Sequence, residues 1–227
     1  MDCEKKYLRK VILFYMNMKI PKELLYPAPF YNFLSYISES DVTGPILDCG
    51  SGGPYPKQAL FVQLGFDIIG IEFLNDRLEM AQEYAKQQKV ELNMQMGDMR
   101  AIPFESNHFA YVYSWNTIFH MNKKDIKKSV DEMIRVLKPG GICFVNFLST
   151  DSERYGKGEE PNPGECVEIY DNEAVMHTYF NNEEPDKLFE DLEVEILYKE
   201  KRLFTKKYED GIDKGCYFDY IVKKKRS

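Results

Sequence analysis

The sequence lacks the cysteine spacing of a zinc site or of a disulfide framework. Its 227 residues include 5 cysteines and 3 histidines, all widely dispersed, and no two cysteines form a CxxC pair. No metal site is therefore predicted. An odd number of scattered cysteines, of which Cys49 and Cys143 lie in apolar runs, is typical of a reducing compartment. We expect a cytoplasmic protein that binds no metal.

Long hydrophobic runs and an excess of positive charge are also absent. The longest early apolar run, residues 11–16, is too short for the core of a signal peptide or for a membrane span. The formal net charge is -7, whereas nucleic-acid binding depends on clustered Lys and Arg. The basic run at residues 223–226 is interpreted as a solvated chain end. Neither a nucleic acid nor a membrane is expected as a partner.

Strand-like and helix-like segments alternate through the first two thirds of the chain. Helices are predicted at 29–40, 56–64, 75–89 (with Asn75 as its cap) and 123–137, and strands at 46–49, 67–72, 92–96, 109–115 and 142–148. Several of these strands are continuously apolar, which is typical of a parallel sheet covered on both faces. The pattern predicts an α/β fold, a Rossmann-like three-layer sandwich.

The pattern changes after residue 149. Residues 150–164 are polar and rich in Gly and Pro, and are predicted to form a long loop. A hairpin is predicted at 165–180, turning near residues 171–172. A short helix at 183–190 and two strands, at 192–201 and 215–222, complete the chain. Because no crossover helix joins these two strands, they must pair antiparallel.

The segment "ILDCGSGGP" at residues 46–54 joins the first strand to the next helix through three glycines. Glycines at the carboxyl end of a strand allow a nucleotide-like ligand to approach the backbone. The dinucleotide fingerprint requires a further glycine where this chain has Tyr55. Asp48 would repel a pyrophosphate and would attract a cation. These features favour S-adenosylmethionine, which has a sulfonium and an ammonium group but no phosphate.

Two more acidic residues follow predicted strands. Glu72 ends the second strand, in a position to accept hydrogen bonds from ribose hydroxyls. Asp98 follows the third strand and can accept a hydrogen bond from an adenine amino group. Three carboxylates at successive strand ends, Asp48, Glu72 and Asp98, together indicate an adenosine-containing cofactor.

Four segments carry a resemblance to a known family: "ILDCGSGG" at 46–53, "GIEFLNDRLEMA" at 70–81, "GDMRAIPFESNHFAYVYSWNTIFHM" at 97–121 and "VLKPGG" at 136–141. In their order and spacing they resemble the class I S-adenosylmethionine-dependent methyltransferases, particularly the small single-domain enzymes that act on small molecules. The resemblance implies a mostly parallel seven-stranded sheet with an antiparallel last strand, and a small hairpin insertion after strand five. The cofactor-binding residues that it implies are Asp48, Gly50, Gly52, Glu72, Phe73, Asp98, Met99, Ser114 and Trp115. Pro54 departs from the family pattern and leaves the exact loop contacts open.

The methyl acceptor is expected beside His120, which follows the fourth strand. A base is needed only if the acceptor must lose a proton, and His120 is the candidate; the alternative is a capping or packing histidine. The hairpin residues Tyr170, His177 and Tyr179, and Tyr31 of the first predicted helix, are candidate substrate contacts, with ordinary packing as the alternative. The chain has "WNTI" at 115–118, where amino-methylating nucleic-acid enzymes carry an Asp/Asn-Pro-Pro-aromatic motif. The expected acceptor is a small molecule.

One domain is predicted, with four parts: an N-terminal helical cap at 1–44, a cofactor-binding core at 45–148, a loop and hairpin at 149–181 as a possible substrate lid, and a C-terminal helix with antiparallel strands at 182–227. Two other functions stay open. One is a protein that binds S-adenosylmethionine without turnover, and the other is an NAD-type oxidoreductase. A monomer or a homodimer is expected.

Overall fold

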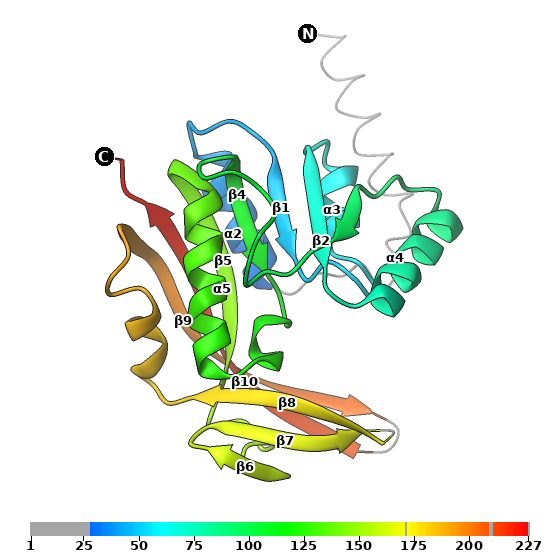
Figure 1. Ribbon diagram of the computed structural model, residues 1–227, viewed down its shortest axis with the longest axis vertical. Helices are drawn as coiled ribbons and strands as arrows, with labels where there is room; N and C mark the ends of the chain where they lie inside the picture. Colours follow the sequence, from blue (N-terminus) through cyan, green and yellow to red (C-terminus); the bar gives the residue numbers. More distant parts are fainter. Residues whose placement is uncertain (1–27, 171, 209–210, 227) are drawn as a thin grey trace, which may run out of the picture.

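The computed structural model describes residues 28–170, 172–208 and 211–226. Its main sheet has the spatial strand order β3 (Met94–Met96), β2 (Ile68–Glu72), β1 (Ile46–Cys49), β4 (Phe109–Ser114), β5 (Leu137–Ser149), β10 (Gly211–Lys224) and β9 (Val194–Tyr208) (Figure 1). The first five strands are parallel to one another. β10 runs antiparallel to both of its neighbours. The predicted seven-stranded, mostly parallel sheet with a reversed last strand is confirmed.

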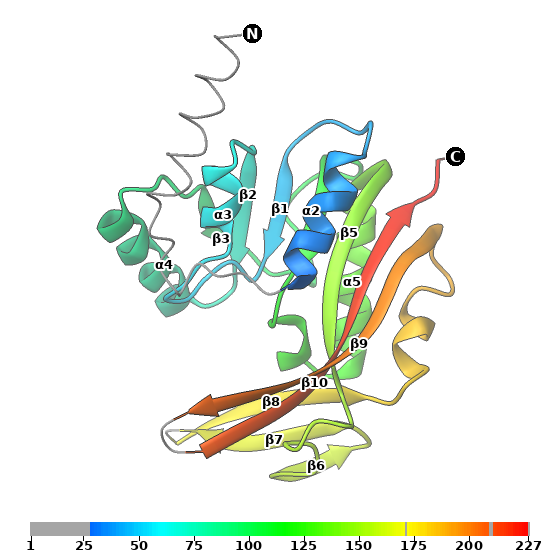
Figure 2. The ribbon, with the colours of Figure 1, turned by 180° about the vertical axis from the view of Figure 1, so that it is seen from behind.

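Helices cover both faces of this sheet, as Figures 1 and 2 show from opposite sides. α5 (Lys123–Val136) packs on one face, while α2 (Ala28–Ser38) and α3 (Gln58–Gln63) pack on the other. α4 (Asn75–Gln88) contacts β2 and β3. Because apolar residues recur at helical spacing, α2 presents one buried stripe to the sheet: Phe30, Phe33 and Ile37. The three-layer arrangement is therefore as predicted.

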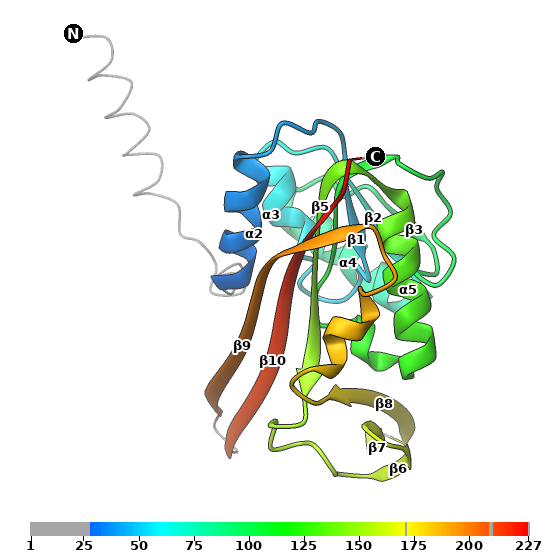
Figure 3. The same cartoon turned by 90° about the vertical axis from the view of Figure 1, so that its left-hand side faces the viewer.

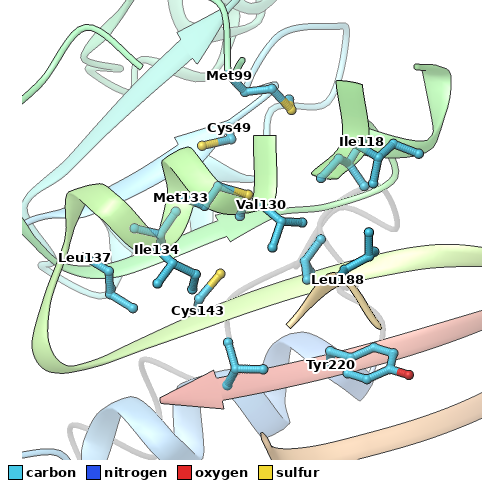
Figure 4. Packing of buried hydrophobic residues seen from close by; sticks show 14 of the residues in the cluster. Cys49, Met99, Ile118, Val130, Met133, Ile134, Leu137, Cys143, Leu188 and Tyr220 are labelled. Atoms are coloured by element: carbon cyan, nitrogen blue, oxygen red, sulfur yellow. The ribbon is translucent and has the colours of Figure 1, made fainter. Parts of the chain in front are cut away.

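The core between α5 and the sheet is continuous and apolar. Figure 4 shows Val130 and Met133 of α5 beside Cys49 of β1 and Cys143 of β5, all of which belong to one buried cluster. The two cysteines are free thiols. Burial raises the pKa of the Cys49 thiol well above its usual value. Both cysteines therefore serve as small apolar core residues.

The insertion after β5 contains three strands: β6 (Glu159–Asn162), β7 (Glu165–Tyr170) and β8 (Glu173–Phe180). β7 and β8 form the predicted hairpin, and β8 joins the main sheet by pairing parallel to the end of β5. The prediction of a loop throughout 150–164 was wrong at β6. This edge strand contains a proline and pairs with β7 at only two positions. The segment is a strand because it pairs with β7, although its own sequence has no alternating apolar pattern.

Three local predictions also differ from the structure. Leu74, not Asn75, occupies the N-cap of α4, and the Asn75 amide donates to Glu79 Oε1 instead of capping. The short C-terminal helix is a 3-10 turn, η3 (Glu184–Leu188). β9 and β10 are 15 and 14 residues long and pair well beyond the predicted strands. In Figure 3 their far halves extend past the sheet and face the β6–β8 insertion.

Candidate functional site

The three predicted carboxylates lie at one edge of the sheet. β1, β2 and β3 are adjacent and parallel, so their carboxyl ends meet there (Figure 1). Asp48 lies in β1, Glu72 ends β2, and Asp98 follows β3. The Gly97 N–H donates to the Glu72 carbonyl at 2.9 Å, which holds the turn before Asp98 against β2. Ligands of open α/β sheets bind at this edge.

Asp48 is almost fully buried. The Tyr113 hydroxyl donates to Asp48 Oδ2 at 2.5 Å, across the paired strands β1 and β4. The pKa of Asp48 is raised to about 7: burial is the main cause and the charge of Glu72 adds to it, while the Tyr113 hydrogen bond and the charge of Lys57 oppose the shift. A buried carboxylate with this pKa is stabilised as an anion when a cation binds beside it.

Glu72 organises the glycine loop. Its Oε2 accepts from the Gly52 N–H at 2.9 Å, and its Oε1 accepts from the Leu74 N–H at 3.0 Å. A Cβ on Gly52 would lie 2.6 Å from Glu72 Oε2. Gly50 has φ +85°, and a Cβ there would lie 2.3 Å from Thr117 Cγ2. The glycines are thus required for the loop to close on Glu72 and on Thr117, a contact that the sequence did not predict.

Asp98 is held by an arginine that the sequence analysis did not select. Arg100 Nε donates to both Asp98 oxygens at 3.0 Å, and Arg100 also pairs with Asp125 at 3.1 Å. Hydrogen bonds from Arg100 keep the pKa of Asp98 below its usual value. The Arg100 guanidinium also lies 5.4 Å from the centroid of the Phe73 ring, which is largely exposed. The adenine contact of Asp98 stays a prediction.

Three predicted cofactor residues remain: Ser114 ends β4, Trp115 follows it, and Met99 lies in the turn after β3. Side chains alternate along a strand, so Ser114 points to the face opposite Tyr113. The Ser114 hydroxyl is buried and has no hydrogen-bond partner among the residues that the structure describes. Trp115 packs against Phe30 of α2, with ring centroids 4.9 Å apart. The Met99 side chain belongs to the core (Figure 4), which leaves its backbone for any ligand contact.

A pocket of about 270 Å³ lies between the insertion, the far half of β9–β10 and η2 (Ile118–His120). Three of the five predicted substrate residues, His120, His177 and Tyr179, line it. Tyr31 does not line it and is exposed on α2. The side chain of Tyr170 lies outside the described part of the chain. The lining also includes side chains that the sequence analysis did not select: Asn116, Phe119, Leu148, Ser152, Arg154, Phe204 and Tyr217.

The two pocket histidines are in contact, with ring centroids 4.8 Å apart. His120 Nδ1 lies 3.1 Å from the Met176 carbonyl oxygen. Desolvation by the pocket walls lowers the pKa of His120, although part of its side chain is exposed, and burial together with His120 and Arg154 lowers the pKa of His177 to about 4. His177 Nδ1 is 3.5 Å from Glu168 Oε1, but Glu168 is already paired with Arg154. Both imidazoles are therefore neutral at pH 7.

An asparagine pair joins the glycine loop to this pocket. The Asn116 N–H donates to Asn146 Oδ1 at 2.8 Å, and Asn146 Nδ2 donates back to Asn116 Oδ1 at 2.7 Å. Asn116 has φ +53°, a conformation that asparagine tolerates better than most residues. The turn fixed in this way carries Thr117 to the glycine loop and His120 to the pocket. Asn146, a polar residue inside the apolar run "ICFVNFL", was the signal that the sequence analysis missed.

The described residues contain no group of three or more His, Cys, Asp or Glu side chains able to hold a metal ion. In the same part of the chain, no helix has the length and apolar character required to cross a membrane.

Residues 46–141 match a family model described as "Methyltransferase domain". Sterol 24-C-methyltransferase of Saccharomyces cerevisiae is 33% identical over 139 residues, which cover 58% of this chain and 33% of that enzyme. The enzyme of the same name from Debaryomyces hansenii is 26% identical over 173 residues, covering 74% of this chain and 44% of that enzyme. The chain thus spans less than half the length of these curated relatives.

Two solved structures share the fold over most of their length. An S-adenosylmethionine-dependent methyltransferase of Methanosarcina mazei superposes with a TM-score of 0.71 at 21% identity, covering 89% of this chain and 99% of that one. A 1,6-didemethyltoxoflavin-N1-methyltransferase of Burkholderia thailandensis, with bound 1,6-didemethyltoxoflavin and S-adenosylhomocysteine, superposes with a TM-score of 0.62 at 10% identity, covering 99% and 86%. Residues 46–141, which contain the glycine loop, are therefore similar to a methyltransferase domain, and the chain has the fold of S-adenosylmethionine-dependent methyltransferases.

Proposed function

We propose that the protein transfers a methyl group from S-adenosylmethionine to a nucleophilic atom of a small molecule. The observation that carries this proposal is the buried Asp48 carboxyl at the end of β1, beside a glycine loop closed on Glu72. A buried acid whose pKa is about 7 suits a ligand that brings its own positive charge. An uncharged or phosphorylated nucleotide would leave this carboxylate uncompensated.

The donors and acceptors at the sheet edge fit the cofactor. Each Glu72 oxygen accepts one backbone N–H and retains a second lone pair for a ribose hydroxyl. The buried Ser114 hydroxyl has no partner in the described residues and can bond to a ligand. When bound, S-adenosylmethionine would supply a methyl group on a sulfonium, from which a neutral thioether departs as a good leaving group. The residues of this chain then act mainly by holding donor and acceptor in line and by excluding water.

The small-molecule acceptor is supported by the names of the relatives, which act on a sterol and on a toxoflavin precursor. The cytoplasm is the proposed location, because the four described cysteines are free and buried. A monomer or homodimer, with neither a nucleic acid nor a membrane as partner, completes the proposal.

Ligand-dependent stability tests the cofactor assignment. S-adenosylhomocysteine at 100 times its Kd should stabilise the protein by about 2.7 kcal/mol, which raises Tm by about 5–10 °C for a chain of this size. NADH should leave Tm unchanged. Stabilisation by NADH but not by S-adenosylhomocysteine would favour the oxidoreductase instead.

Turnover distinguishes an enzyme from a binding protein. Protein incubated with methyl-labelled S-adenosylmethionine and a small-molecule extract should move label into a product. Asp48→Asn should lower both cofactor affinity and labelling. Tight cofactor binding with no labelled product in any extract would favour the binding-only function.

A further inference from the structure

We propose that the pocket beside His120 takes a planar, ring-bearing acceptor whose reacting atom is a ring hydroxyl or ring N–H, and that His120 Nε2 removes its proton. This inference rests on the proposed function and identifies the acceptor class of that same site. It is carried by three features of the pocket: the shape of its walls, its charge and the hydrogen bond that orients His120.

Three aromatic rings that pack on one another line one side of the pocket, Phe119, Phe204 and Tyr217. Phe204 of β9 and Tyr217 of β10 are stacked, with ring planes 13° apart and centroids separated by 5.5 Å. Phe119 of η2 lies 5.9 Å from Tyr217. The stack depends on Gly215, because a Cβ there would lie 2.2 Å from the Phe204 ring. Flat aromatic faces favour a flat ring by offset stacking.

The volume and charge of the pocket restrict the size and charge of the acceptor. Its volume of about 270 Å³ is close to the lower end of the roughly 300–1,000 Å³ range of drug-sized sites, which suits one or two fused rings. Arg154 is paired with Glu168, and both histidines are neutral at pH 7. The charge of Arg154, which lines the pocket, is thus compensated by Glu168, which does not, so an acceptor that is uncharged before reaction is favoured.

The Met176 carbonyl sets the tautomer of His120. A carbonyl oxygen accepts hydrogen bonds and cannot donate them, so the His120 Nδ1 that lies 3.1 Å away must carry the proton. In the neutral ring Nε2 then has the lone pair. Met176 of β8 is therefore a positioning residue. Its backbone carbonyl fixes the proton on His120 Nδ1 and leaves Nε2 ready to accept a proton.

The reaction balances without a further reactant. The acceptor O–H or N–H bond breaks and its proton passes to His120 Nε2, giving an imidazolium. The acceptor atom bonds to the methyl carbon, the S–C bond breaks, and its electron pair returns to sulfur to give S-adenosylhomocysteine. Because burial lowers the pKa of His120, the imidazolium then loses its proton to solvent at neutral pH.

Acceptor acidity tests the role of His120. With 2-naphthol as the probe, His120→Gln should lower kcat at least 100-fold, as expected when a general base is lost. With a nitrophenol that is already ionised at the assay pH, the same variant should stay within about fivefold of wild type, since no proton remains to be removed. His108→Gln provides the matched control, because His108 is exposed like His120 but does not line the pocket. Equal losses with both probes would overturn the base assignment.

A panel of acceptors tests the proposed class. Wild-type protein saturated with cofactor should methylate 2-naphthol or benzimidazole at least tenfold faster than cyclohexanol or a sterol with an unsaturated side chain. Phe204→Ala should raise KM for the ring probes about five- to tenfold and leave cofactor affinity unchanged, because it removes one stacking face. Ile169→Ala, on the exposed face of β7, is the control. Faster transfer to cyclohexanol or the sterol would overturn this inference while the methyltransferase function stands; absence of cofactor binding would instead defeat the proposed function.

Discussion

At the scale of single residues, Asp48 shows how burial can link proton and ligand binding. Its buried carboxyl accepts a hydrogen bond from the hydroxyl of Tyr113, which belongs to the aromatic cluster under α2 and α3. Desolvation favours the neutral acid, so the pKa rises to about 7. A cation bound nearby favours the carboxylate and so lowers this pKa. Cofactor binding below pH 7 must therefore release a proton.

This linkage predicts the pH dependence of cofactor affinity. Between pH 7 and pH 5, the Kd of S-adenosylmethionine should rise by up to about tenfold per pH unit, because protonated Asp48 must first ionise. Calorimetry at several pH values would measure both Kd and the proton released. Asp48→Asn should bind weakly with a nearly flat profile over this range. A wild-type profile that is equally flat would contradict the pairing of Asp48 with the cofactor.

At the scale of elements, the helix caps show the limits of residue type as a sequence signal. Asn122 caps α5, and its Oδ1 accepts from the Asp125 N–H at 2.8 Å. Asn75 is equally suitable by residue type, but it lies one residue after the cap position of α4. Its side-chain amide donates to Glu79 instead. Residue type alone does not distinguish these two sites, because the backbone angles of the preceding loop decide which residue occupies the cap.

Alanine substitutions of the two asparagines should therefore differ in their effect on thermal stability. Asn122→Ala should destabilise the protein by about 1 kcal/mol, lowering Tm by about 2–4 °C, because the first turn of α5 loses its acceptor. Asn75→Ala should change Tm by less than about 1 °C, because only an exposed side-chain contact is lost. Thermal melts of both variants provide the comparison, and equal shifts would contradict the cap assignment.

At the scale of the whole molecule, the sheet separates two cores. One lies under α5 and contains Met133; the other lies under α2 and α3 and includes Phe33 and Tyr113. The proposed cofactor edge and the proposed acceptor pocket beside His120 lie at the ends of these layers, where strands give way to turns. Stability and ligand binding should therefore respond differently to substitutions deep in the core.

Met133→Ala tests this separation. Met133 is fully buried, so its truncation should lower the free energy of unfolding by about 2–5 kcal/mol. The Kd of S-adenosylhomocysteine, measured well below the melting temperature, should stay within about twofold of wild type. Met80→Ala, on the exposed side of α4, is the control and should have little effect on either quantity. A large change in Kd would show that the core under α5 also shapes the cofactor site.

Much of the fold could be predicted from the sequence, because strand and helix periods are local properties. The parallel core strands, α5, the β7–β8 hairpin and the antiparallel ending all follow from such patterns. β6 could not be predicted in this way, because its edge pairing is a property of its neighbour. The same distinction applies at the site, where the acids at strand ends are recognisable but their partners Tyr113 and Arg100 are not.

The sequence by itself determined the order of strands along the chain, the glycine loop and the placing of Asp48, Glu72 and Asp98 at one sheet edge. Those features depend on residues close together in the chain and on the rule that parallel strands share a carboxyl edge. Only the tertiary structure decided that His120 meets His177, and that Phe204 stacks on Tyr217 beside them. These contacts join segments far apart in the sequence, and strand register and side-chain packing, not local pattern, bring them together.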